Sequence, residues 1–169
     1  MVIWLSGLSG SGKTTIGKLV WTILKNKFGY AVLLDGDEIR SVLGNSIGHD
    51  LESRRLNSIR IGRLCELLDR QGIPVVCCAM TIAPEVQVRN RKELSNYVEV
   101  FLEVSLEVLE KRDPKGIYKN ARAGLLKNVS GMDIPYSPPT NPHLNINNND
   151  DQVDHSMIVN SILAFSGLA

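Results

Sequence analysis

The chain has 169 residues, with 19 Lys and Arg against 18 Asp and Glu, which gives a formal charge of +1. This length predicts one domain over residues 1–169 with a sizeable core. A near-neutral balance gives no reason to expect nucleic acid or a membrane as a partner, and no apolar stretch approaches the about 20 residues of a membrane span. Three cysteines, two of them adjacent in an apolar run, are typical of buried thiols in a reducing compartment. We therefore expect a cytoplasmic protein.

Short apolar runs alternate with helical patterns along the chain. This alternation predicts an α/β fold with a five-stranded parallel sheet that helices cover on both faces. Strands are predicted at 2–5, 31–34, 75–79, 98–104 and 144–146, and helices at 13–27, 53–71, 83–94, 105–111 and 153–165. Gly29 and Gly72 follow predicted helices, where a left-handed backbone is least costly. They mark the turns back into the sheet.

A phosphate-binding loop follows the first apolar run. Residues 7–14, here called the P-loop, read Gly-Leu-Ser-Gly-Ser-Gly-Lys-Thr and fit the pattern G-x-x-x-x-G-K-[ST]. The glycines let backbone N–H groups curl around phosphate oxygens, Lys13 reaches the β- and γ-phosphates, and the Thr14 hydroxyl can hold Mg²⁺. The N-terminus of the next helix adds further N–H donors. The predicted ATP-binding residues are Gly7, Ser9, Gly10, Ser11, Gly12, Lys13, Thr14 and Thr15.

An Asp-Gly-Asp sequence at 35–37 closes the second predicted strand. At the carboxyl end of a parallel strand, its two carboxylates can face the crevice beside the P-loop. One carboxylate could order Mg²⁺ through water, and the other could accept the proton of an acceptor hydroxyl. Arg40, Arg54 and Asn57 could clamp an anionic acceptor. A plain turn and a solvated helix face are the structural alternatives for these two groups.

The segment from residue 112 to about residue 142, here called the lid, breaks the alternation of strands and helices. It is rich in Lys, Arg, Gly and Pro and contains no clear strand pattern. Such a segment is typical of a mobile excursion over a nucleotide site.

Several motifs together closely resemble the adenylyl-sulfate kinase family. They are Arg-Asp-Pro-Lys-Gly at 112–116, Arg-x-x-Asn at 54–57, Gly-Met-Asp-Ile-Pro-Tyr at 131–136 and the Asp-Gly-Asp above, and the resemblance extends from the P-loop to about Pro142. It implies a P-loop kinase three-layer sandwich with a lid. It also implies Mg²⁺-dependent transfer of the ATP γ-phosphate to the ribose 3′-hydroxyl of adenylyl sulfate, a small nucleotide acceptor. Relatives are often dimers, so a homodimer is implied too.

The resemblance also implies roles for single residues. Asp37 would be the catalytic base and Lys13 would act on the phosphates, while Asp35 would support the metal with Thr14. Arg122 from the lid would help to cover ATP. The residues implied at the acceptor are Asp37, Arg40, His49, Arg54, Asn57, Ile82, Ala83, Lys119 and Val129.

The chain departs from the family pattern on the acceptor side. His49 and Val129 stand where the family usually has two phenylalanines that sandwich the acceptor adenine. Stacking contributes about 1–3 kcal/mol per base, so the loss of both could weaken adenine binding by roughly one to several decades unless other contacts replace them. Ala83 and Val86 replace a serine and an arginine of the family's Ile-Ser-Pro-Tyr-Arg stretch.

These departures leave the reaction unchanged and the acceptor open. One alternative acceptor is cytidine diphosphoramidate, whose ribose 3′-hydroxyl a related activity of the family phosphorylates in capsule decoration, because a smaller pyrimidine needs less of an aromatic sandwich. Ordinary drift within an adenylyl-sulfate kinase explains the departures equally well. A non-catalytic nucleotide-binding regulator and a kinase for a non-nucleotide alcohol are disfavoured, because the candidate base, metal carboxylate and lid motif are all present.

Overall fold

The computed structural model describes residues 1–44 and 48–168. Five strands form one sheet in the order β2-β3-β1-β4-β5, and each pair of neighbouring strands is parallel. The strands are β1 (Val2–Ser6), β2 (Val32–Asp35), β3 (Val75–Cys78), β4 (Tyr97–Glu103) and β5 (Leu144–Asn147). This sheet confirms the predicted α/β fold.

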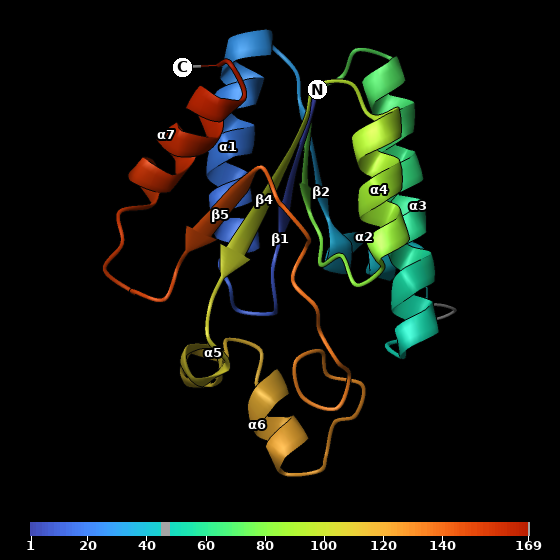
Figure 1. Ribbon diagram of the computed structural model, residues 1–169, viewed down its shortest axis with the longest axis vertical. Coiled ribbons are helices and arrows are strands. Elements are labelled where there is room, and N and C mark those ends of the chain that lie inside the picture. Colours follow the sequence, from blue (N-terminus) through green and yellow to red (C-terminus); the bar gives the residue numbers. More distant parts are fainter. Residues whose placement is uncertain (45–47, 169) are drawn as a thin grey trace.

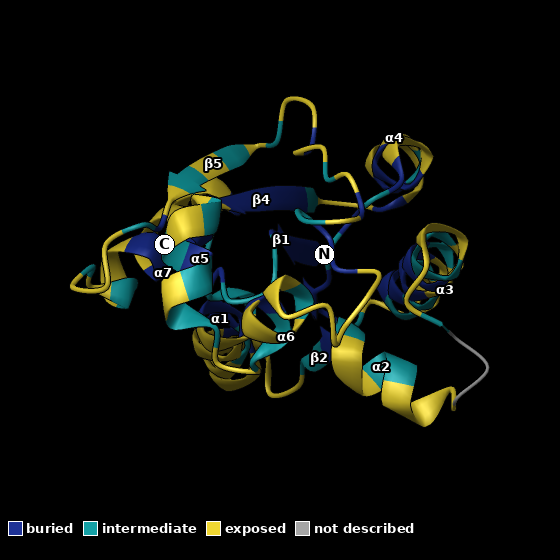
Figure 2. Ribbon diagram, turned by 90° about the horizontal axis from the view of Figure 1, so that it is seen from below, coloured by how far each residue is buried: buried dark blue, intermediate teal, exposed yellow. Residues whose placement is uncertain are grey.

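Long helices cover both faces of the sheet (Figure 1). They are α1 (Lys13–Phe28) and α7 (His155–Phe165) on one face and α3 (Leu51–Arg70) and α4 (Pro84–Glu93) on the other. A hydrophobic core lies on each face of the sheet, and alternating side chains of β1 enter one or the other. Ile3 and Leu5 pack in the cluster with α1 and α7, whereas Val2 and Trp4 pack with Ile61 of α3. Figure 2 shows β1 and β4 buried at the centre and the edge strand β5 only partly covered.

Every predicted strand and helix is present, with ends within two residues of the prediction. Gly29 and Gly72 have the expected left-handed backbone, with φ of 79° and 73°. Within the described residues, none of the helices combines the length and the apolar character that a bilayer crossing requires.

Three short helices lie near the carboxyl ends of the strands: α2 (Gly36–Val42), α5 (Leu106–Arg112) and α6 (Ile117–Arg122). Sequence analysis predicted only α5. It missed α2 because the Asp-Gly-Asp sequence is typical of a turn, whereas the Asp35 side chain in fact accepts a hydrogen bond from the Asp37 N–H and caps a helix. It missed α6 because Pro and Gly surround this six-residue helix inside the lid.

Candidate active site

A cavity of about 340 Å³ opens at the carboxyl ends of β2 and β3, below the lid. Its walls come from the P-loop, α2, α3 and the lid. Of the residues predicted for function, it is lined by Ser9, Gly10, Gly12, Lys13, Thr14, Thr15, Asp35, Asp37, Arg40, His49, Arg54, Asn57, Ile82 and Val129. The fold therefore brings most of the predicted donor and acceptor residues around one space.

The P-loop lysine is folded back onto its own loop. Lys13 Nζ donates to the carbonyl of Leu8 at 2.7 Å and to Ser11 Oγ at 3.4 Å. Burial lowers the pKa of Lys13 to about 8. These contacts hold the ammonium beside the loop N–H groups, which is where a triphosphate would lie.

Thr14 and Asp35 form the candidate metal site. Thr14 Oγ1 donates to Asp35 Oδ2 at 2.7 Å, and the other carboxylate oxygen, Oδ1, accepts from the Asp37 N–H at 2.9 Å. Asp35 is only 8% exposed, so the strand end and the helix cap fix its direction. The pair presents a hydroxyl and a carboxylate oxygen side by side, which are ligand types that Mg²⁺ prefers.

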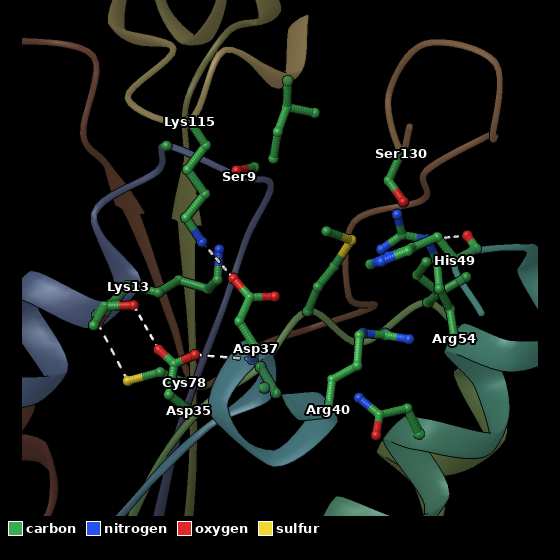
Figure 3. A pocket seen from close by; sticks show the side chains of 18 of the residues that line it. Ser9, Lys13, Asp35, Asp37, Arg40, His49, Arg54, Cys78, Lys115 and Ser130 are labelled. Atoms are coloured by element: carbon green, nitrogen blue, oxygen red, sulfur yellow. Dashed lines mark hydrogen bonds and ion pairs between the residues drawn. The ribbon is translucent and has the colours of Figure 1, made fainter. Parts of the chain in front are cut away.

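The predicted base, Asp37, pairs with a lysine of the lid. Lys115 Nζ donates to Asp37 Oδ2, as Figure 3 shows. Burial acts to raise the pKa of Asp37, but the hydrogen bond and charge of Lys115 outweigh it, with smaller help from Lys13 and Arg40, so the pKa is lowered. The same contact raises the pKa of Lys115. Lys115 therefore favours the carboxylate form of Asp37.

Arginines of α2 and α3 dominate the acceptor side of the cavity. Arg40 donates to the carbonyl of Gly48. Arg54 donates through Nε to the carbonyl of His49 and through Nη2 to that of Asn128, both at 2.7 Å. The second contact ties α3 to the lid. Asn57 is 5% exposed, and its Oδ1 has no hydrogen-bond partner in the described part of the chain.

Some predicted residues do not line the cavity. Gly7 and Ser11 are buried and do not line the cavity. Ala83 is buried at the start of α4. None of the three lines the cavity in this conformation, and their roles stay predictions.

Two predicted lid residues also lie outside the cavity. The backbone N–H of Lys119 donates to Asp113 Oδ2 at 2.9 Å, and its side chain does not line the cavity. Arg122 pairs with Glu110 at 2.6 Å and does not line the cavity. The structure therefore places neither side chain against the cavity, and a substrate contact by either would need the lid to rearrange.

The structure also brings in residues that sequence analysis did not select. Lys115 lay in a quoted motif, but nothing in the sequence paired it with Asp37. Tyr118 donates its hydroxyl hydrogen to the Ser9 carbonyl at 2.9 Å, and Asn148 Nδ2 donates to the Ser11 carbonyl at 2.9 Å. Ser130 also lines the cavity. These contacts join segments far apart in sequence, so no local signal could have indicated them.

Known proteins match nearly the whole chain. The family model described as adenylylsulphate kinase matches residues 1–147. The adenylyl-sulfate kinase of Gloeothece citriformis is 40% identical over 163 residues, which covers 96% of this chain and 92% of that protein. The adenylyl-sulfate kinase of Clostridium kluyveri is 40% identical over 166 residues, with 98% and 82% covered.

Solved structures agree in fold. The Mycobacterium tuberculosis APS kinase CysC in complex with AMPPNP and APS superposes with a TM-score of 0.85 at 30% identity, covering 97% of this chain and 95% of that chain. The crystal structure of APE1195 gives a TM-score of 0.81 at 34% identity, with 98% and 96% covered. A gluconokinase from Sinorhizobium meliloti, at 20% identity and a TM-score of 0.62, shares the fold alone.

Proposed function

Because this chain belongs to the adenylylsulphate kinase family, we propose that it transfers the γ-phosphate of ATP to the ribose 3′-hydroxyl of adenylyl sulfate. Kinases of this family are phosphotransferases with an alcohol as acceptor. The observation that carries the proposal is that one cavity brings Lys13, Asp37 and Arg54 together. These residues match the three parts of the reaction, namely the phosphate donor, the attacking hydroxyl and an anionic acceptor.

The transfer is a displacement at the γ-phosphorus. The acceptor oxygen forms the new P–O bond, Asp37 receives the hydroxyl proton, and the bond from the γ-phosphorus to the bridging oxygen breaks as ADP leaves. Lys13 and the N–H groups at the start of α1 stabilise the charge on the phosphates. Arg40 and Arg54 suit the anionic end of the acceptor, because guanidinium groups bind such oxygens in pairs. The lid would exclude water, which is a competing acceptor.

Thr14 and Asp35 fit a magnesium ion. Their oxygens lie 2.7 Å apart at the end of the P-loop. Mg²⁺ commonly takes one or two protein oxygens together with substrate phosphates and water, so two residues are enough. When bound, the metal would neutralise charge on the β- and γ-phosphates. Asp35 would orient the metal through its carboxylate, whose direction is fixed because the same carboxylate caps α2.

The proposed acceptor is adenylyl sulfate. The relatives named above are adenylyl-sulfate kinases, and the comparisons lend no support to cytidine diphosphoramidate. The alternative acceptor was suggested by His49 and Val129, which stand where the family usually has phenylalanine. Val129 is 4% exposed and also packs in an apolar cluster with Leu109 and Tyr118, so its side chain serves the lid interior as well as the cavity wall.

The test compares the two acceptors directly. ADP release from Mg-ATP is measured with adenylyl sulfate and with cytidine diphosphoramidate, and kcat/KM is compared. We expect a clear preference for adenylyl sulfate. A preference for the cytidine compound would overturn this acceptor, and the absence of acceptor-dependent ADP release with either would favour a nucleotide-binding regulator.

Three further properties belong to the proposal. The chain would act as one kinase domain over residues 1–169, in the cytoplasm, where its three buried free thiols would stay reduced. A homodimer also stays a prediction, and light scattering at several protein concentrations tests it.

A further inference from the structure

The lid carries a buried serine hydroxyl, that of Ser130, at the wall of the cavity. Ser130 is 4% exposed and lines the cavity, yet its Oγ has no hydrogen-bond partner among residues 1–44 and 48–168. Buried hydroxyls in folded proteins are normally paired, because an unpaired one loses its water without compensation. An unpaired hydroxyl on a cavity wall therefore indicates a group whose partner arrives with a ligand.

The turn that carries Ser130 is held in place by its own hydrogen bonds. The backbone N–H groups of Asn128 and Val129 donate to the carboxylate of Asp133 at 2.6 and 2.5 Å. A backbone bridge between Ser130 and Ile134 closes the turn. Because the turn is already ordered, a contact made by this hydroxyl carries little further ordering cost.

The hydroxyl lies at the acceptor end of the cavity. Arg54 reaches from α3 to the carbonyl of Asn128, two residues before Ser130, at 2.7 Å. Figure 3 shows Ser130 on the side of Arg54 and His49, across the cavity from Lys13. A bound triphosphate at the P-loop would therefore leave Ser130 to the acceptor.

We propose that the Ser130 hydroxyl hydrogen-bonds the base of the acceptor nucleotide and sets part of its affinity. This inference rests on the proposed function, which places the acceptor 3′-hydroxyl at Asp37. Arg40 and Arg54 match the anionic end of the acceptor. A neutral hydroxyl that can both donate and accept suits the remaining uncharged part, which is the edge of the base. Ser130 is thus a specificity residue and takes no part in the chemical step.

Steady-state kinetics test this contact. Ser130→Ala should raise KM for adenylyl sulfate about three- to tenfold, with kcat and KM for ATP changed by less than about twofold. Ser130→Thr, which keeps a hydroxyl, should restore most of the affinity. Inhibition by ribose 5-phosphate, which lacks a base, should be equal in Ser130→Ala and wild type. Ser137→Ala is the matched control, because Ser137 is an exposed serine of the same segment.

The outcomes separate this inference from the proposed function. An unchanged KM for adenylyl sulfate in Ser130→Ala would overturn the inference and leave the function standing. A parallel rise in KM for ATP would overturn it as well, since that result points to a displaced lid. Weaker inhibition by ribose 5-phosphate would move the contact away from the base and so contradict it. A wild-type protein that releases no ADP with adenylyl sulfate would overturn both.

Discussion

The ammonium group of Lys115 pairs with the carboxylate of Asp37, although the two residues lie 78 positions apart in the sequence. The contact joins the lid to the start of α2, beside the P-loop. It places a cation on the carboxylate that we propose as the base, and it lowers the pKa of that carboxylate against the opposing effect of burial. The lid therefore influences the protonation state of Asp37 as well as covering the cavity.

Replacing this lid cation should shift the pH profile. In Lys115→Met the pKa of Asp37 should rise, because Asp37 would lose the hydrogen bond and the positive charge of Lys115 that lower it. Asp37 would become protonated at a higher pH, so the acid limb of the kcat/KM profile should shift to higher pH. Lys111→Met is the control, because Lys111 is exposed and pairs with Glu107 on the surface of α5. An acid limb at the wild-type position would contradict a functional pairing.

The proposed metal site can be tested without unfolding α2. Asp35→Asn removes the charge that would hold Mg²⁺, but asparagine also caps helices well, so α2 should persist. The Mg²⁺ concentration for half-maximal turnover should rise about 10- to 100-fold. Magnesium titrations of ADP release measure it, with Glu38→Gln on the exposed side of α2 as the control. A wild-type magnesium requirement in Asp35→Asn would remove Asp35 from the metal site.

ATP affinity should fall in alkaline solution because Lys13 titrates. Burial lowers the pKa of Lys13 to about 8, so its ammonium is present below that pH and is lost above it. Since the charged form attracts phosphate, the affinity of the free protein should fall from pH 7 to pH 9, by at most about tenfold per pH unit above 8. Calorimetric titration with a non-hydrolysable ATP analogue measures it. Lys13→Ala should bind weakly with no such pH dependence, and a flat wild-type profile would refute the assignment.

Asn148 should position the P-loop. Its side-chain Nδ2 donates to the Ser11 carbonyl at 2.9 Å, and its backbone carbonyl accepts from Arg112 Nη1 at 2.9 Å. A Cβ at Gly12 would stand 2.8 Å from Asn148 Nδ2, so the two segments approach as closely as glycine permits. Asn148→Ala should destabilise the fold by about 1–2 kcal/mol and raise KM for ATP more than KM for the acceptor. Thermal unfolding and kinetics measure both effects, with the exposed Asn145→Ala as the control. Equal effects on the two KM values would argue against a role specific to the P-loop.

The fold follows from local patterns, so most of it could be predicted. Strand and helix periodicity located the sheet and its covering helices, since the buried side chains of β1 and the long helices leave clear apolar spacing. The P-loop sequence located the donor site. Short helices could not be predicted in this way. Helix α6 has six residues, of which only Tyr118 is buried, so it shows no apolar periodicity.

The contacts inside the candidate site could be predicted only in part. The sequence indicated that Asp37 and Arg54 would share a cavity, because Asp37 belongs to the Asp-Gly-Asp motif and Arg54 to the Arg-x-x-Asn motif. It could not show that Lys115 reaches Asp37 or that Arg54 binds the carbonyl of Asn128, since these contacts depend on where the lid docks. For Arg122, the family resemblance implied a role at ATP, whereas the structure pairs it with Glu110.

The most direct test of the central claim follows labelled phosphate from the γ-position of ATP. Wild-type protein should transfer the label to adenylyl sulfate and not to its 3′-deoxy analogue. Asp37→Asn should lose about 100-fold or more in turnover while still binding ATP, because Asp37 acts on the acceptor hydroxyl and not on the P-loop. No transfer to adenylyl sulfate, transfer to the 3′-deoxy analogue, or full turnover in Asp37→Asn would contradict the account.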